Sequence, residues 1–367
     1  MSELWRKLMN RTCTVQSKID QVCLQDPDVC FEDSCCTSWI ASTSLPYRGV
    51  QTLHIILSFM GLCCSTLYLK KYSSKSMITG NPKIFINASV IVMMIHSVDM
   101  ICLHVFHIYQ SFTVDPETPC AVRNTVYFCA PFRYVYSLCL VFLCTLQYSL
   151  NIDRFLCAYD KMYEKKKKVI RMVLIVHLVL FTIGVVAWVY RNENPDAYLL
   201  SCLNVPLDSI YDLSKVTLCF LPLNCLCFVA SVCLFSRFKR KEKNFRSRFV
   251  MIRHFTAAVD TQMAEFLWRM TGTQAALIVI YPIIAISQRL VYAYVSRPLH
   301  LALATFTYIF SFYCFLVPYV MIQSVKKLRE GRREKINSHV SMKSSGTEGS
   351  NNYFTSLQNQ WNGPINR

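Results

Sequence analysis

The chain of 367 residues is 53% hydrophobic and only 17% charged, and its mean hydropathy is positive. This balance is too apolar for a soluble domain of ordinary composition, so we expect a protein that resides in a lipid bilayer. The formal net charge of +17 does not indicate a nucleic-acid partner, because lysine and arginine lie in short segments between apolar runs. The 19 cysteines fall both in these runs, where a thiol packs as a small hydrophobe, and in segments where disulfides are permitted.

The N-terminal segment is polar and rich in cysteine. It lacks an apolar core of the length that a cleavable signal peptide requires. The triplet Asn10-Arg11-Thr12 is an acceptor for N-glycosylation, which suits an extracellular segment. Its cysteines are Cys13, Cys23, Cys30, Cys35 and Cys36. We therefore predict that residues 1–48 form an extracellular, cysteine-rich segment.

Seven apolar runs follow, each near the ~20 residues that a membrane-spanning helix needs. They cover residues 50–69, 84–108, 126–150, 172–190, 214–235, 270–292 and 299–322. The last two runs are separated by few polar residues, and Arg289 and Arg297 lie close to their expected outer boundary. The sequence predicts an all-α membrane protein with a seven-helix bundle over residues 49–322.

The connections between the runs differ strongly in basic residues. One alternate set holds 28 lysines and arginines, and the other holds 9. The richer set comprises residues 70–83, 153–171, 236–269 and 323–367, and the poorer set comprises residues 1–48, 109–124, 191–213 and 289–298. Basic residues favour the cytoplasmic side, so the sequence predicts an outside N-terminus and a cytoplasmic C-terminus. Because the chain from Ser338 is rich in polar residues, we expect residues 323–367 to form a disordered cytoplasmic tail.

No zinc-protease, P-loop, nucleophile-elbow or metal-binding cysteine motif stands in a suitable place, so we expect neither an enzyme nor a cofactor. His104 and His107 share a face of the second helix downstream of Asp99, a pattern consistent with a metal or proton site. Histidines near a helix end more often meet the membrane interface, and we expect no metal. A carboxylate in an apolar run faces the bundle interior, so Asp99 either pairs within the protein or contacts a ligand or ion.

A series of short motifs runs through the membrane region. They are Asp115-Pro116 and Cys120 in the first outer connection, Cys129-Ala130-Pro131-Phe132 opening the third helix, Asp153-Arg154 closing it, Tyr163 before Lys165 to Lys168, Cys202 and Pro206 in the second outer connection, and Asn244 to Phe249 before the sixth helix. In order and spacing they resemble those of the nematode serpentine receptors of class alpha and their sister classes. The N-terminal segment and the tail lie outside this resemblance.

The resemblance implies a seven-helix chemoreceptor in the plasma or ciliary membrane of sensory neurons. Such a receptor binds an external small-molecule cue and couples to a heterotrimeric G protein. Asp153-Arg154-Phe155 also resembles a triplet of rhodopsin-like receptors, but Val317-Pro318-Tyr319 stands where those receptors carry NPxxY. The alternative is a transporter or channel, which is expected to carry internal repeats, and no repeat is evident in this sequence.

The outer cysteines give one site prediction. Cys129 is expected at the outer end of the third helix and Cys202 in the connection between the fourth and fifth, so we predict a disulfide between them. Cys120 is a competing partner, either for Cys202 or for an N-terminal cysteine.

The second site prediction concerns the expected cytoplasmic end of the third helix, where Arg154 follows Asp153. A guanidinium there either pairs with a carboxylate or offers its donors to the backbone carbonyls of a partner. We predict that Asp153, or an acidic residue near the sixth helix such as Asp260 or Glu265, holds Arg154 until a G protein engages it. Lys165 to Lys168 are expected to attract anionic lipid and an acidic partner surface.

Overall fold

The computed structural model describes most of the chain. It covers residue 35 and residues 38–73, 80–115, 118–160, 162–246, 251–291, 294–340 and 346–361. The predicted glycosylation site Asn10 and the cysteines Cys13, Cys23, Cys30 and Cys36 lie outside the described residues. The chain divides into two compact units, Met1–Met321 and Ile322–Arg367, which we describe in turn.

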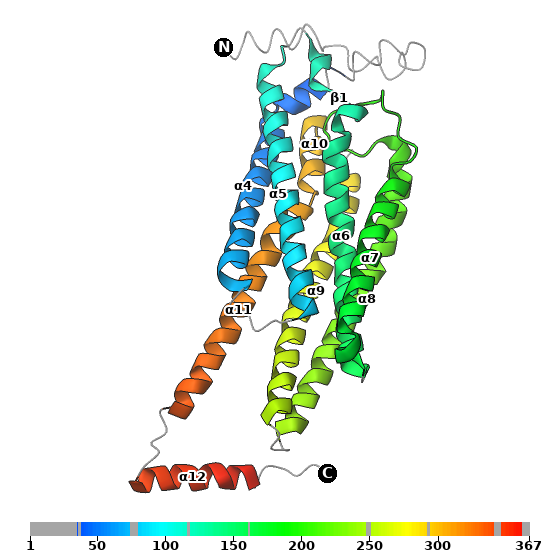
Figure 1. Cartoon of the computed structure of the whole chain (residues 1–367). Helices are drawn as coiled ribbons and strands as arrows, with labels where there is room; N and C mark the ends of the chain where they lie inside the picture. Colours follow the sequence, from blue (N-terminus) through cyan, green and yellow to red (C-terminus); the bar gives the residue numbers. More distant parts are fainter. Residues whose placement is uncertain are drawn as a thin grey trace. The chain divides into compact units, whose positions relative to one another are not determined.

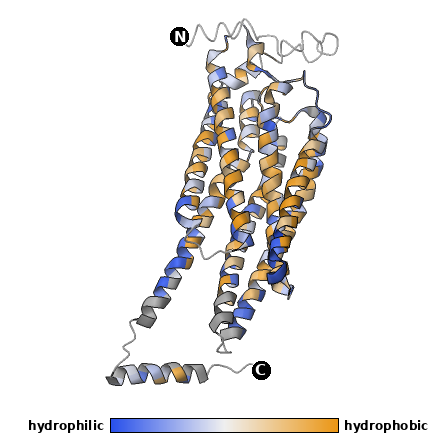
Figure 2. Ribbon diagram, in the orientation of Figure 1, coloured by the Kyte–Doolittle hydropathy of each residue, from blue (hydrophilic) through white to orange (hydrophobic). Residues whose placement is uncertain are grey.

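Long helices make up the first unit (Figure 1). Among the described residues, seven helical segments are long and apolar enough to cross a membrane, which confirms the predicted all-α, seven-helix fold. The helices are α4 (Leu45–Leu67, continued by the π-helix Tyr68–Ser73), α5 (Asn81–Thr113), α6 (Val126–Tyr159), α7 (Tyr163–Val189), α8 (Leu207–Arg246), α9 (Met251–Val291), α10 (Arg297–Phe306) and α11 (Phe310–Val340). Hydrophobic residues dominate the middle of the bundle helices, and hydrophilic residues gather toward their ends (Figure 2).

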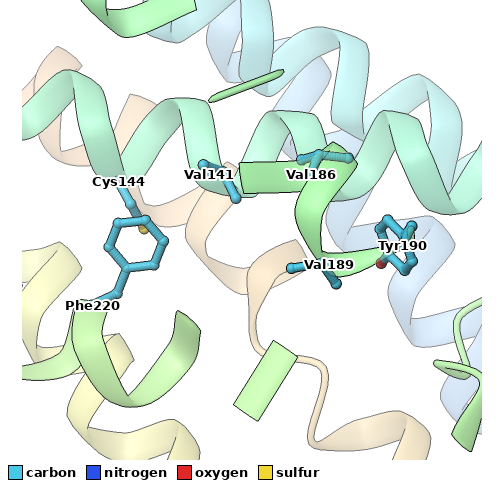
Figure 3. Close-up of a cluster of buried hydrophobic side chains, with 6 residues drawn as sticks. All are labelled: Val141, Cys144, Val186, Val189, Tyr190 and Phe220. Carbon is cyan, nitrogen blue, oxygen red and sulfur yellow. The ribbon is translucent and has the colours of Figure 1, made fainter. Parts of the chain in front are cut away.

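Packing between helices closes the bundle. Contacts join α4 to α5, α5 to α6, α6 to α7 and α8, α8 to α9, α9 to α10, and α10 back to α4. One apolar cluster fixes α6 between α7 and α8 (Figure 3), through Val141, Cys144, Val186, Val189, Tyr190 and Phe220. We call the end of the bundle with Cys129 and Cys202 the outer end, and the end with Asp153 and Arg154 the inner end, after the predicted orientation.

A tight turn starts α5. Gly80, just before this helix, has a φ of 74°, a left-handed conformation that other residues rarely adopt. A Cβ at this position would lie 2.9 Å from Cε of Lys167 on α7. Asn81 and Pro82 follow at the first positions of α5, where proline is well tolerated because no intrahelical donor is lost. The turn therefore brings Asn81 close to the start of α7.

The seventh span differs from the single helix predicted over residues 299–322. α10 ends at Phe306 and α11 begins at Phe310. At this break, the carbonyl oxygen of Thr305 lies 3.0 Å from Nε2 of His54 on α4. A broken helix is tolerated inside a membrane when a neighbour bonds the freed backbone groups. The apolar run alone does not reveal that neighbour.

The sixth span predicted at residues 270–292 corresponds to the C-terminal half of α9, and this helix begins well before it, at Met251. Glu265 and Arg269, which the prediction placed in the connection before this span, lie on the same helix. They form an ion pair one helical turn apart, at 2.5 Å. Pairing offsets part of the cost of a charge close to the membrane.

The predicted lysine-rich connection before the fourth span is also helical. Lys165–Lys168 lie in the first turns of α7, which leaves residues 160–162 as the connection from α6. The Met162 N–H donates to Oδ1 of Asp160 at 2.8 Å and closes this short turn. Positive charge is unfavourable at a helix N-terminus, and Glu164 partly offsets it through an ion pair with Lys167 at 3.5 Å.

The second unit contains the rest of α11, up to Val340, and α12 (Gly346–Trp361). We predicted a disordered tail over residues 323–367, and the described backbone there is largely helical. The described side chains of α12 are mostly exposed, in line with a composition that cannot bury a core. A composition with few apolar residues predicts that the side chains of this segment are exposed, and an exposed segment can still be helical.

Candidate functional site

The connection between α7 and α8 is tied down at the outer end. A disulfide joins Cys202 in this connection to Cys129 in the first turn of α6. The strand β2 (Tyr198–Leu199) pairs antiparallel with β1 (Asn124–Thr125), just before α6. The Cys202 N–H also donates to Nε2 of His107 on α5, at 3.2 Å. The connection is therefore bonded to both α5 and α6.

Two further bonds lie near this end, one before α6 and one between α4 and α5. Cys120, the alternative partner of Cys202, forms a disulfide with Cys35 of the N-terminal segment. Arg48 on α4 donates through Nη2 to the carbonyl oxygen of Ser111 on α5, at 2.6 Å. The N-terminal segment, α4 and α5 are thereby joined near the outer end.

A buried arginine that we did not single out from the sequence lies near the outer end of α6. Nη2 of Arg133 is 2.6 Å from Oε1 of Glu193, and the two side chains are 0% and 6% exposed. The Tyr134 hydroxyl donates to Oε2 of Glu193 at 3.0 Å. The Arg133 guanidinium lies 5.3 Å from the ring centre of Tyr190, whose pKa is raised by burial. The signal was present in the sequence, since Arg133 is a charged residue within an apolar run.

Asp99 is 9% exposed within α5. Its Oδ2 has no hydrogen-bond partner among the described residues. Asp99 lies close enough to Cys139 on α6 and to Tyr308 at the break in the seventh span to interact with them electrostatically. A buried carboxylate without a partner is costly, so both predicted roles, internal pairing and ligand contact, stay predictions.

The two histidines of α5 lie in different surroundings. His107 accepts the N–H of Cys202, whereas neither ring nitrogen of His104 has a hydrogen-bond partner within the part of the chain that the structure describes. Within the described ranges, His, Cys, Asp and Glu form no group of three or more that fits a metal ion.

A buried polar cluster surrounds Asp153 at the inner end of α6. Nε and Nη2 of Arg154 donate to Oδ2 of Asp153, at 3.1 and 2.7 Å. The Tyr163 hydroxyl and the Asn81 amide each donate to Oδ1 of Asp153, at 2.9 and 3.0 Å. Nη2 of Arg154 also donates to the Tyr163 hydroxyl at 3.1 Å. Charge-assisted bonds in a buried place are strong, and these couple α6 to α5 and α7.

Of the two acidic candidates on α9, Asp260 lies near Arg154 and Glu265 does not. Oδ1 of Asp260 is 3.7 Å from Nη1 of Arg154, which is an ion-pair distance but too long for a hydrogen bond. Glu265 is paired with Arg269 instead. Arg154 is therefore held firmly from α6 and α7 and weakly from α9.

Polar side chains inside the bundle link α8, α9 and α11. Nε2 of Gln274 donates to Oδ1 of Asn224 at 2.7 Å, and the Tyr313 hydroxyl donates to Oε1 of Gln274 at 3.0 Å. Nearer the inner end, the Ser231 hydroxyl donates to Oδ1 of Asn151 on α6 at 2.7 Å. Such bonds between membrane helices contribute about 1 kcal/mol each, so they link the helices without locking them.

Seven apolar spans, ionisable groups that face the bundle interior and a buried aspartate–arginine pair closing the third span are features of a seven-helix membrane receptor. The chain matches the family described as serpentine type 7TM GPCR receptor class ab chemoreceptor over residues 32–362, and it belongs to that family. It is 43% identical over 353 residues to serpentine receptor class beta-18 of Caenorhabditis elegans, covering 95% of this chain and 97% of the relative. It is 21% identical over 318 residues to serpentine receptor class beta-17 of the same organism, covering 85% and 86%.

These relatives confirm a serpentine receptor and correct its class. The prediction named class alpha or a sister class, whereas the family is class ab and the relatives are named class beta. Cys129, Asp153 and Arg154 carried much of that resemblance and lie toward the two ends of α6, and Cys202, which also carried it, is bonded to Cys129. Motifs at such positions indicate the shared architecture of a seven-helix receptor and do not separate one class from another. The relatives carry receptor names, in agreement with the prediction of a receptor rather than an enzyme.

Proposed function

We propose that this receptor binds an external chemical cue in sensory neurons and activates a heterotrimeric G protein at its inner end. The observation that carries the proposal is the state of Arg154, which is buried, bonded to Asp153 and Tyr163, and 3.7 Å from Asp260. A buried ion pair contributes little net stability, because desolvation offsets the attraction. A switch between two arrangements explains better why a guanidinium is buried at this place.

The resting arrangement is the one described, with Arg154 turned to Asp153. Displacement of α9 removes Asp260, and a shift of α7 removes the Tyr163 hydroxyl from the cluster. The freed guanidinium then donates to backbone carbonyls of the G protein. A cue that binds nearer the outer end favours this second arrangement by shifting an existing equilibrium.

Two further parts of the proposal concern ligand and partner contacts. Asp99 is the proposed ligand contact, since its Oδ2 is buried without a hydrogen-bond partner among the described residues. Lys165, Lys166 and Lys168 are exposed in the first turns of α7, where they attract anionic lipid or an acidic surface of the partner.

The proposed orientation places residues 1–48, with a glycan on Asn10, outside the cell and residues 323–367 in the cytoplasm of a plasma or ciliary membrane. It is supported by the 28 to 9 division of basic residues between the two sets of connections. Epitope tags at residues 2 and 367 test it in intact cells. The first tag should react with antibody without permeabilisation and the second only after it, and the reverse pattern would reject the orientation.

The test of function expresses the chain with a promiscuous G-protein reporter and screens volatile and water-soluble odorants for an agonist. Arg154→Ala should then abolish agonist-driven nucleotide exchange. Surface expression is measured in parallel, because the variant leaves the buried Asp153 with the donors of Tyr163 and Asn81 but without its counterion. Nucleotide exchange is therefore compared per receptor at the cell surface. Arg171→Ala, on the inner part of α7, is the matched control and should signal normally. Normal signalling by Arg154→Ala would reject the switch, and equal loss on changing Lys165–Lys168 alone would move the contact to α7.

A further inference from the structure

Polar atoms without partners gather where α4, α5 and the seventh span meet. Among the described residues, eight such buried atoms belong to these elements. Two of them are Oγ of Ser65 and Oδ2 of Asp99, and the other six are Oε1 of Gln51, Nδ1 of His54, Oγ of Ser58, both ring nitrogens of His104 and Oγ of Ser311. The side chains that carry these six atoms are 0% or 1% exposed. Buried polar groups are nearly always hydrogen-bonded in native proteins, so the six atoms indicate a partner that the described residues do not supply.

The rings of His54 and His104 define the centre of this group. They stack with ring centres 5.1 Å apart and an angle of 10° between their planes. Nε2 of His54 lies 3.0 Å from the carbonyl oxygen of Thr305, which only accepts, so Nε2 carries the proton and Nδ1 is a free acceptor. A neutral His104 offers one donor and one acceptor. Gln51, one helical turn from His54 on the same face, adds an acceptor oxygen.

The described groups that surround His104 most closely are neutral, and the nearest carboxylate named so far on α5 is that of Asp99. The groups that interact with it electrostatically are His54, His96 and His107, and none of these is a carboxylate or an ammonium group. A buried ion without a counterion is strongly disfavoured, so a neutral ligand suits the two histidines, whereas a cation would be drawn to Asp99. The Phe312 ring, 6.3 Å from that of His54, supplies an apolar surface beside the polar atoms.

We infer that this site binds a small uncharged alcohol. Its hydroxyl group donates to Nδ1 of His54 or to the free acceptor of His104, and it accepts from the N–H of His104. Its carbon skeleton packs beside Phe312. The inference rests on the proposed receptor function for the identification of the alcohol as the external cue, but the binding itself requires no G protein.

The test uses the full-length receptor in lipid nanodiscs and measures binding by fluorine NMR. The probes are 4-fluorobenzyl alcohol and two fluorinated aliphatic alcohols of different length. 4-Fluorotoluene, 4-fluorobenzylamine and 4-fluorobenzoate are the matched compounds, and empty nanodiscs correct for partition into lipid. We expect at least one alcohol to bind roughly tenfold tighter than 4-fluorotoluene, because only the alcohol pairs with the histidines.

Variants locate the binding. His104→Phe should abolish the preference for the alcohol, and His104→Asn, which keeps a donor and an acceptor, should retain part of it. His177→Phe changes an exposed histidine on α7 and should bind like the wild type. If His104→Phe does not fold, the preference for the alcohol over 4-fluorotoluene is compared between the wild type and His104→Asn, and that comparison still tests the role of His104.

Several outcomes would overturn the inference. Equal binding of the alcohols and 4-fluorotoluene, or no binding of any alcohol, would assign the unpartnered atoms to structural water. Stronger binding of 4-fluorobenzylamine would place the contact at Asp99. Equal binding by the wild type and His104→Phe would place it elsewhere. Arg154→Ala should keep the preference for the alcohol over 4-fluorotoluene even if the affinity changes, so failure of the switch and failure of this site can be told apart.

Discussion

The two ends of α6 are built in different ways. At the outer end, Cys129 is covalently bonded to Cys202, and the buried pair of Arg133 and Glu193 lies one helical turn further along. At the inner end, Arg154 is held by hydrogen bonds to Asp153 and Tyr163 and by a long ion pair with Asp260. The same helix is therefore fixed where the cue is proposed to arrive and bonded reversibly where the partner is proposed to bind.

This difference indicates which part of the receptor moves. A covalent bond on the outer connection keeps its geometry through a conformational change, whereas hydrogen bonds and ion pairs exchange partners at modest cost. We therefore expect changes at the outer end to affect stability most and changes at the inner end to affect basal signalling most. Four substitutions test this expectation, in order of decreasing effect on stability.

Glu193→Ala should destabilise the receptor most, by about 3–5 kcal/mol, because it leaves the buried guanidinium of Arg133 without its counterion. Thermal unfolding in detergent can be read with a thiol-reactive dye, since Cys139, Cys144 and Cys227 are free and buried. The double variant Arg133→Met with Glu193→Leu should recover most of the loss, because no charge remains unpaired. A single variant as stable as the wild type would show that the pair is not buried in the membrane-embedded receptor.

Cys202→Ser should lower stability by about 2–4 kcal/mol, the usual contribution of a disulfide that closes a long loop. The expected fall in the midpoint of thermal unfolding is roughly 5–10 °C. Cys129→Ser and the double variant should lose the same amount as Cys202→Ser, since each removes one and the same bond. Peptide mapping without reduction is the control, and a Cys120–Cys202 peptide would contradict the pairing.

Tyr163→Phe removes two hydrogen bonds of the inner cluster, one to Asp153 and one from Arg154. The expected loss of stability is about 1–2 kcal/mol, because the remaining donors still reach the carboxylate. Basal nucleotide exchange should rise, since the resting arrangement is weakened more than the active one. Tyr159→Phe, an exposed tyrosine on α6, is the control. Unchanged basal exchange would remove Tyr163 from the switch.

Asp260→Asn should have the smallest effect on stability, below about 1 kcal/mol, because the ion pair is long and 27% of the Asp260 side chain is exposed. Its effect should appear as a modest rise in basal exchange. Glu265→Gln is the matched control on α9, since Glu265 pairs with Arg269 and not with Arg154. Equal effects of the two variants would mean that charge on α9 acts on the receptor generally and not through Arg154.

The sequence predicts the third span well and the seventh less well. α6 begins at Val126, as its apolar run does, and the Thr125 side chain caps the helix by accepting from the Phe128 N–H. The break in the seventh span is accompanied by a bond from His54 on α4. This is a contact between helices, and hydropathy along one segment does not contain it.

At the candidate site, too, the sequence predicts single residues better than the contacts between them. Position along the chain was enough to select Arg154, Asp153 and Asp260, since charge at the end of an apolar run is visible in the sequence. Asn81 was missed because its contact with Asp153 depends on the left-handed turn at Gly80. Arg133 was missed although its signal was equally visible. An ionisable residue inside an apolar run marks a site worth examining at every position, including near the ends of a span.

The bonds that hold the connection between α7 and α8 affect the expected rates of ligand binding and release. His107 holds the backbone of Cys202, and the fully buried His104 lies one helical turn further into the bundle. A molecule that reaches His104 must wait for helices or the disulfide-tied connection to separate, and it must wait again to leave. Association that requires such an opening is slow, and dissociation is slowed by the same barrier. The expected physiological signature is a response that rises and decays slowly, so the cell registers the sustained presence of a compound rather than its brief pulses.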